Sequence, residues 1–302
     1  MARRGPAAGG PPGPAGVAVV DKPPGWTSHD VVAKARGLLG TRKVGHSGTL
    51  DPDATGVLVL GVGRATRLLT YVTGLDKSYV GEVVLGTATS TLDASGKVTG
   101  TWDMSGVRLA DVRAAATGLT GDLLQVPPMT SAKQVGGRRL HELARAGVEV
   151  EREPVAVRVG RFGVGEPVAP GVFPVSVTCS SGTYVRSLAA DLGAALGGGA
   201  HLRHLRRTAV GPFGSEEAVP LEALTPERLL PPVEALRGRP RVVVDDDVAA
   251  LVCHGRVLEG DVLGVSADGP WAVVDRGGSL LAVYERHRGT TVKPGVVLAE
   301  RL

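Results

Sequence analysis

The segment Gly45–Gly56 constrains the fold more than any other, because its sequence GHSGTLDPDATG contains three glycines and one proline in twelve residues. Glycine reaches backbone angles that other residues avoid, and proline removes an N–H donor, so the segment predicts an irregular loop. Pro52 also pushes Asp51 toward extended backbone. A buried strand is expected over Val57–Leu60 directly after the loop.

Asp51 is the first candidate for chemistry. A carboxylate presented on a rigid loop suits a covalent or acid–base catalyst, since positioning supplies much of a catalysed rate. Asp51 could equally cap a turn through its own backbone, and Asp53 could be that capping residue. A buried carboxylate needs a nearby cation to stay ionised, and Arg186 is a plausible partner at the start of a helix, or else a surface arginine.

Apolar periodicity predicts several further elements. A strand is expected over Val17–Val20, and Thr27 or Ser28 should cap a helix that ends near Leu39. The remaining strands and helices expected in the first two thirds of the chain are strands at Tyr79–Leu85, Val155–Val159 and Val172–Thr178, and helices at Leu109–Thr117, Leu140–Ala146 and Tyr184–Leu196.

Composition divides the chain into three parts. Residues 1–15 are almost entirely Gly, Pro, Ala and Arg and predict a disordered tail. Residues 224–240 are rich in Pro and Arg and are interpreted as a linker. Short β-type runs at Val242–Val244, Val262–Val265, Trp271–Val274 and Leu280–Tyr284 predict a small β-rich module. The expected domains are therefore 16–235 and 240–302.

Composition also excludes several classes of protein. Of the 302 residues 43% are hydrophobic and 21% charged, as in soluble globular proteins. No apolar run is long enough for a membrane span, and the N-terminus lacks a secretory signal. Cys179 and Cys253 lie far apart without metal-ligand spacing, which argues against disulfides and structural zinc. A cytoplasmic location is expected.

Basic and aromatic side chains suggest contact with nucleic acid. The net charge is +4, and Arg203, Arg206 and Arg207 lie close together, as is suitable for phosphate contact, although a solvated charged face is the alternative. Tyr79 and Tyr184 are candidate base-stacking platforms or core residues.

The histidines and a Gly-Val-Gly turn are considered for acid–base catalysis, metal binding and dinucleotide binding. His46 could be a general base, insert into a nucleic-acid stack or bond the loop backbone. No histidine has metal-ligand spacing, so no metal site is expected. Gly61-Val62-Gly63 is a weak dinucleotide-binding signal, because Thr66 replaces the third glycine.

Four motifs occur in order along the chain. They are Asp21–Ser28 (DKPPGWTS), Gly45–Leu58, Cys179–Leu188 (CSSGTYVRSL) with Asp191-Leu192-Gly193, and Gly199–Arg207 (GAHLRHLRR) with Val210-Gly211. Together they resemble the motifs of the bacterial tRNA pseudouridine-55 synthases, the TruB family. The match runs over nearly all of residues 17–215.

The resemblance implies a role for each matching residue. Asp51 would be the essential carboxylate, with Arg186 as its ion-pair partner. Tyr79 would stack on the target uracil and take part in proton transfer, and Tyr184 and Leu205 would line the pocket. His46 would hold the flipped-out T-loop, and Lys22 would belong to a supporting motif at the substrate site. Arg203, Arg206 and Arg207 remain candidate contacts to the RNA backbone.

The implied reaction cleaves the N-glycosidic bond of uridine 55 in the tRNA T-arm, rotates the uracil and rejoins it through C5, without any cofactor. The implied fold is α+β, with a mixed, largely antiparallel central sheet, an active-site cleft across its middle and a C-terminal PUA-like RNA-binding domain. A monomer is expected. Thr130, Gln134 and His141 depart from the residues usual in the family, which leaves details of T-arm contact open.

Three other functions are weighed against this one. The chain could be the catalytic subunit of an RNA-guided complex, or a tRNA-folding chaperone, although Asp51, Tyr79 and Arg186 argue against an inactive enzyme. A carboxylate glycosidase needs two paired acids, and Asp53 is the one close second acid.

Overall fold

The structure is a computed structural model that describes residues 13–299 apart from 132, 136, 149 and 267. Most of the expected disordered tail, residues 1–12, therefore lies outside the described residues. Pro14 and Ala15 pack closely against Gly63, so the last part of that predicted tail belongs to the folded structure.

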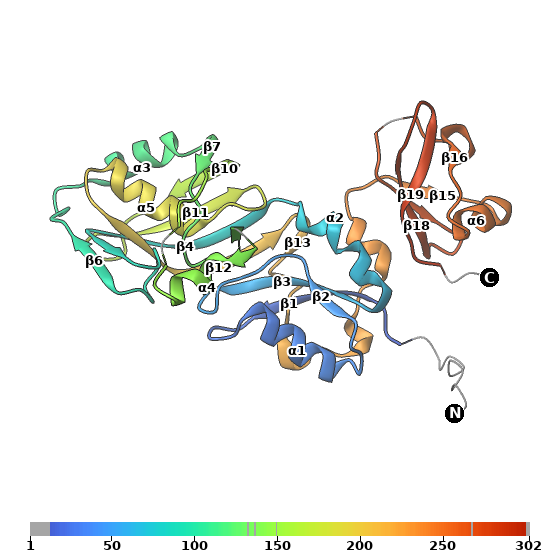
Figure 1. Cartoon of the computed structure of the whole chain (residues 1–302), viewed down its shortest axis with the longest axis horizontal. Helices are drawn as coiled ribbons and strands as arrows, with labels where there is room; N and C mark the ends of the chain where they lie inside the picture. The colour runs from blue at the N-terminus through green and yellow to red at the C-terminus, as the bar shows by residue number, and fades with distance from the viewer. Residues whose placement is uncertain (1–12, 132, 136, 149, 267, 300–302) are drawn as a thin grey trace.

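A large mixed sheet forms the centre of the molecule (Figure 1). Its order is β14-β1-β3-β12-β4-β11-β10-β7, with β2 paired to β3 and β13 paired to β12. The pairs β1–β14 and β3–β12 are parallel and the others antiparallel, which confirms the predicted mixed, largely antiparallel sheet. Its strands are β1 Gly16–Lys22, β2 Val44–His46, β3 Thr55–Val62, β4 Lys77–Leu85, β7 Gly121–Gln125, β10 Val155–Val164, β11 Val172–Cys179, β12 Ala200–Val210, β13 Phe213–Gly214 and β14 Val219–Pro220.

Helices cover the sheet, and two short hairpins extend from it. Of the two predicted caps, Thr27 and Ser28, it is Thr27 that caps the first helix, through a capping box with Asp30. The helices are α1 Ser28–Leu38, η1 Gly63–Leu68, α2 Leu69–Thr73, α3 Leu109–Gly118, α4 Leu140–Arg145, α5 Val185–Ala195, η2 Leu221–Ala223, η3 Pro226–Arg228 and η4 Pro232–Leu236. The hairpins are β5 Thr87–Thr89 with β6 Val98–Thr101, and β8 Gln134–Val135 with β9 Arg138–Arg139.

Alternation along the strands divides the core into separate clusters. In β1, Ala18 and Val20 face α1, whereas Val17 and Val19 face η1, α2 and η4 on the other side of the sheet. A further cluster packs α3 and α5 onto β4, β10, β11 and β12. The two halves of the sheet meet at a short parallel pairing, where Thr55 and Gly56 lie beside Arg206 and Arg207.

The C-terminal domain contains a five-stranded sheet in the order β15-β17-β18-β19-β16. Its elements are β15 Arg241–Val243, α6 Asp246–Cys253, β16 Leu258–Glu259, η5 Gly260–Leu263, β17 Trp271–Val274, β18 Leu280–Arg286 and β19 Thr291–Val297. The predicted β-rich character is confirmed. The strand predicted at Val262–Val265 is wrong, because the chain there turns through η5 and ends it at Gly264 in the left-handed region.

The interpretation of residues 224–240 as a linker is also wrong in part. Val233, Ala235 and Leu236 are buried in the same cluster as Val59 of β3 and Val283 of β18. Tyr71 also donates a hydrogen bond to Glu285 at 2.8 Å. This stretch therefore packs between the sheet and the C-terminal domain instead of spanning open solvent.

Candidate active site

The glycine-rich loop runs from β2 to β3 at the junction of the two sheet halves. Its ends are strands, so the expectation of an irregular path holds for Ser47–Ala54 and not for the whole of Gly45–Gly56. Gly56 has φ +101°, and a β-carbon there would overlap the carbonyl of Arg207. Only glycine allows the loop to return to the sheet this close to β12.

Buried polar side chains hold the loop in place. The Ser28 hydroxyl accepts a hydrogen bond from the Leu50 amide at 2.8 Å and donates to its carbonyl at 3.3 Å. Lys22 donates through Nζ to the carbonyls of Pro52, Trp26 and Pro23 at 2.9, 2.6 and 2.9 Å. These contacts fix the backbone on both sides of Asp51.

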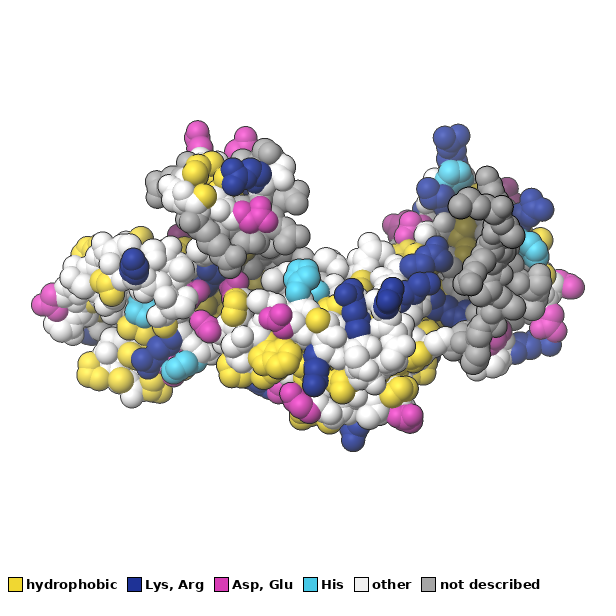
Figure 2. Space-filling view, turned by 60° about the horizontal axis from the view of Figure 1, so that its bottom comes forward, with side chains coloured by type: hydrophobic (Ala, Val, Ile, Leu, Met, Phe, Trp, Pro, Cys, Tyr) yellow, Lys and Arg dark blue, Asp and Glu magenta, His cyan; other side chains and the backbone are white. Residues whose placement is uncertain are grey.

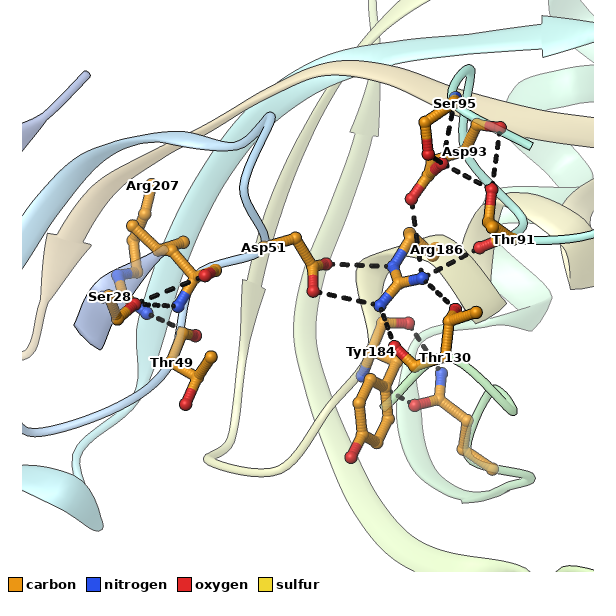
Figure 3. Close-up of polar contacts among 12 residues, drawn as sticks. Ser28, Thr49, Asp51, Thr91, Asp93, Ser95, Thr130, Tyr184, Arg186 and Arg207 are labelled. Atoms are coloured by element: carbon orange, nitrogen blue, oxygen red, sulfur yellow. Dashed lines mark hydrogen bonds and ion pairs between the residues drawn. The ribbon is translucent and has the colours of Figure 1, made fainter. Parts of the chain in front are cut away.

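Arg186 lies directly opposite Asp51 and forms a two-point ion pair with it (Figure 3). Arg186 Nε is 3.0 Å from Asp51 Oδ2, and Nη2 is 3.1 Å from Oδ1. The arginine comes from the first turn of α5 and is 5% exposed. Parallel N–H···O bonds of this kind fix the orientation of a carboxylate as well as its charge.

The rest of the Arg186 guanidinium is surrounded by acceptors from two other segments. Nη1 donates to the Thr91 carbonyl at 2.9 Å and to Thr130 Oγ1 at 2.7 Å, and Nη2 donates to the Thr130 carbonyl at 3.2 Å. Asp93 Oδ2 is 3.5 Å from Nη1. Asp93 is itself fixed by Thr91 and Ser95. Asp93 and Thr91 were not predicted as site residues, because nothing in the sequence of the turn between β5 and β6 links it to α5.

Burial and the neighbouring cations act in opposite directions on the pKa of Asp51. Enclosure by the protein raises the pKa of its carboxyl, and Asp93 raises it further, whereas Arg186 and Lys22 lower it. The Asp51 side chain is nevertheless 39% exposed, because it faces open cavities. It is a carboxylate that a ligand can reach.

Two cavities flank Asp51. One of about 340 Å³ is lined by Tyr79, Tyr184, Leu205, Lys77 and Arg207. The other, of about 590 Å³, lies toward His29, Asp93 and the strained residue His204, which has φ +53°. The structure thus brings Tyr79, Tyr184 and Leu205, which sequence analysis selected, to one cavity beside Asp51.

Each wall residue of the smaller cavity is held by the fold. Tyr79 lies on β4, and burial raises the pKa of its hydroxyl while the positive charge of Arg207 opposes that shift. The Gln125 side chain accepts from the Tyr184 amide at 2.7 Å and donates to its carbonyl at 3.1 Å. Leu205 follows His204 in the β-bulge between Arg203 and Arg206.

His46 is half-buried where β2 enters the loop. Its Nδ1 accepts a hydrogen bond from the Gly48 amide at 3.2 Å, and its ring meets His29 edge-on at 5.5 Å. Burial lowers the pKa of His46, and His29 lowers it further.

The interpretation of Lys22 as a substrate-binding residue is wrong, because its side chain is 0% exposed and donates hydrogen bonds to three backbone carbonyls.

The three arginines of β12 have different surroundings. Arg207 was expected to contact the RNA backbone, but it is 1% exposed and donates to the carbonyls of Val57 on β3 and Gly48 in the loop. That prediction is wrong for Arg207, because the strand directs its side chain inward. Arg203 pairs with Glu82 at 2.6 Å and Arg206 with Asp21 at 2.7 Å, and both remain partly exposed.

A basic surface that sequence analysis missed lies on α1, on the turn after it and on η1. Figure 2 shows Lys and Arg side chains gathered between the middle of the molecule and the C-terminal domain. These elements carry the exposed residues Lys34, Arg36, Arg42, Lys43, Arg64 and Arg67. The cluster is not visible in the sequence, because residues 34–43 and residues 64–67 are far apart along the chain. The fold brings them together, since β2, which follows the turn, packs against η1.

Within the described ranges, no group of three or more His, Cys, Asp or Glu could hold a metal ion. None of the described helices is long and apolar enough to cross a membrane. Gln134 and His141, which depart from the residues usual in the family, have side chains that lie outside the described residues.

Comparisons with known proteins agree with this arrangement. Residues 36–185 match the TruB family pseudouridylate synthase N-terminal domain, and residues 186–235 match the tRNA pseudouridylate synthase B C-terminal domain. A protein named tRNA pseudouridine synthase B from Symbiobacterium thermophilum is 52% identical, over 80% of this chain and 82% of its own. Another of that name from Streptomyces coelicolor is 48% identical, over 91% of this chain and 95% of its own. This chain belongs to the TruB family of pseudouridylate synthases.

Solved structures of the same fold include multi-subunit assemblies. A chain of a Cbf5-Nop10-Gar1 complex has a TM-score of 0.74 at 27% identity, covering 95% of this chain and 85% of that chain. A chain of an H/ACA RNP bound to a substrate RNA containing 2'-deoxyuridine has a TM-score of 0.72 at 26% identity, covering 95% and 86%. The pseudouridine-synthase fold expected from the sequence is confirmed.

Proposed function

We propose that this chain is an isomerase that converts uridine to pseudouridine in tRNA, and that its target is uridine 55 of the T-loop. The observation that carries the proposal is the Asp51–Arg186 ion pair beside a cavity of about 340 Å³ lined by Tyr79, Tyr184 and Leu205. A pyrimidine fits a cavity of this size and lining. The names of the relatives supply the substrate class.

The chemistry needs a base that has left the helical stack, since a carboxylate on a recessed loop cannot reach a stacked uridine. In the proposed reaction the N1–C1′ bond breaks, the uracil rotates, and a C5–C1′ bond forms while C5 loses its proton and N1 gains one. Asp51 is the catalytic carboxylate, and Arg186 keeps it ionised. Tyr79 stacks on the uracil and serves proton transfer, and Tyr184 and Leu205 hold the ring.

The remaining assignments concern how tRNA is held. His46 supports the flipped-out T-loop from the rim of the site. The exposed cations of α1, the following turn and η1 contact phosphates, together with Arg203 and Arg206. Residues 16–235 form the catalytic domain, and residues 240–302 form a PUA-like domain that grips the tRNA away from the T-loop. The enzyme works as a cytoplasmic monomer without a cofactor.

Action on free tRNA is favoured over action within a guided complex. The two relatives named above as tRNA pseudouridine synthase B are 52% and 48% identical to this chain, whereas the chain of the Cbf5-Nop10-Gar1 complex is 27% identical. An unmodified tRNA transcript without guide RNA separates the two, because a guided subunit would leave it unmodified.

The test is pseudouridine formation at position 55 by wild type, Asp51→Asn and Asp53→Asn. Asp53 lies in the same loop but has no contact with Arg186, so Asp53→Asn is the matched control. We expect wild type and Asp53→Asn to modify the transcript and Asp51→Asn to be inactive. Product at another uridine would refute the target, and tRNA binding without product would favour a chaperone.

A further inference from the structure

Arg186 is a buried cation whose hydrogen-bond capacity is completely used. A guanidinium has five N–H groups, and Arg186 makes five contacts of 3.2 Å or shorter to Asp51, Thr91 and Thr130. Thr130 supplies two of these five acceptors, its hydroxyl and its carbonyl (Figure 3). It is therefore as large a part of the arginine's environment as Asp51 itself.

Thr130 is held in this position by contacts that do not involve Asp51. The segment that carries it leaves β7 at Gln125, whose amide bonds the Tyr184 backbone at two points. One residue later, the Val126 carbonyl accepts a hydrogen bond from Ser187 of α5 at 3.3 Å. The segment is thus attached to the same helical turn that carries Arg186, so the Thr130 hydroxyl has a defined location.

The geometry sets up a competition between two carboxylates for one guanidinium. Asp93 Oδ2 lies 3.5 Å from Nη1, the same nitrogen that donates to Thr130 Oγ1 at 2.7 Å. If the hydroxyl is removed, Asp93 is the nearest charged acceptor for the freed N–H group. The guanidinium would then shift toward Asp93 and away from Asp51.

We propose that Thr130 is a positioning residue for the isomerisation, which holds Arg186 against Asp51 and away from Asp93. This inference rests on the proposed function for its kinetic readout. A residue without an oxygen on its β-carbon cannot make the hydroxyl contact.

The charged groups that face Asp51 decide the direction of the effect. They are Arg186 from α5, Asp93 from the β5–β6 turn and Lys22 from β1. Arg186 and Lys22 favour the ionised carboxylate, and Asp93 opposes it. Weaker contact with Arg186 therefore raises the pKa of Asp51 and moves the acid limb of the rate profile to higher pH.

The experiment compares Thr130→Val with Thr130→Ser, which keeps the hydroxyl. Single-turnover rates on the tRNA transcript are measured across the acid pH range. We expect Thr130→Val to slow the reaction roughly tenfold, the loss of one hydrogen bond to a charged group, with its acid limb at higher pH and tRNA affinity unchanged. Thr130→Ser should stay close to wild type. Thr117→Val, which removes an exposed hydroxyl bonded to Arg113 on α3, is the matched control.

Several outcomes would overturn the proposal. They are an unchanged rate and acid limb in Thr130→Val, weaker tRNA binding at an unchanged rate, and equal loss of activity and melting temperature in both Thr130 variants with the acid limb in place. A substrate-free measurement separates this proposal from the proposed function. NMR titration of ¹³C-labelled aspartates, with Asp51 assigned through Asp51→Asn, should show a higher Asp51 pKa in Thr130→Val even if wild type proved inactive on tRNA.

Discussion

Replacement of Arg207 by methionine distinguishes a residue that organises the loop from one that binds RNA. Arg207 donates through Nε to Val57 at 2.7 Å, through Nη2 to Gly48 at 3.2 Å and through Nη1 to Thr49 at 3.5 Å. The first two distances are ordinary for N–H···O bonds, and the third is at the limit. Methionine occupies similar space but leaves these carbonyls unpaired.

The expected loss in the free energy of unfolding follows from the two shorter hydrogen bonds. Hydrogen bonds to charged groups contribute about 1.5–3 kcal/mol each, so together they contribute roughly 3–6 kcal/mol before the cost of burying the guanidinium is subtracted. We expect Arg207→Met to lower the free energy of unfolding by about 3 kcal/mol. The loop should also lose its fixed path, so the single-turnover rate should fall while the salt dependence of tRNA binding stays unchanged.

The assay combines urea denaturation with tRNA affinity at several salt concentrations. Arg203→Met is the matched control, because Arg203 lies on the same strand but is 33% exposed and pairs with Glu82. We expect that control to lose little stability. An Arg207→Met variant that keeps its stability, and whose salt slope for tRNA binding drops by about one, would refute a structural role, because that drop is the signature of a lost phosphate contact.

Substitutions at three other positions in and around the loop should change stability or rate. Gly56→Ala should lower the melting temperature far more than Gly25→Ala, because both residues have positive φ but only Gly56 lies against the Arg207 carbonyl. Thermal unfolding followed by circular dichroism measures the difference. Burial lowers the pKa of Lys22 to about 8, whereas the unfolded chain keeps the proton up to 10.5. The unfolded state binds more protons between these values, so wild type should gain stability over Lys22→Met from pH 8 to 10.5; a pH-independent difference in urea denaturation would contradict this. Asp93→Asn should move the acid limb of the rate to lower pH, because the charge of Asp93 raises the pKa of Asp51; an unmoved limb would show that the two carboxylates are not coupled.

Much of the fold could be predicted from the sequence because apolar spacing is a local property. The helix from Ser28 and the strands around Val57 and Val172 are close to their predicted ranges. In contrast, β12 was missed, since its arginines and histidines conceal a strand whose regular alternation is broken by a bulge. The packed segment at Val233 was missed because proline-rich composition does not reveal tertiary burial.

The candidate site, like the fold, could be predicted from the sequence only in part. Glycine and proline act on the backbone within a few residues, so the sequence alone determined that Gly45–Gly56 contains a constrained loop that carries Asp51. Only tertiary structure decided that Arg186, 135 residues away, is its partner. The same holds for Asp93 and Thr130 around that arginine, and for the burial of Arg207 beside a partly exposed Arg206. Such contacts depend on which strands pair and where a bulge falls, and no local pattern carries that information.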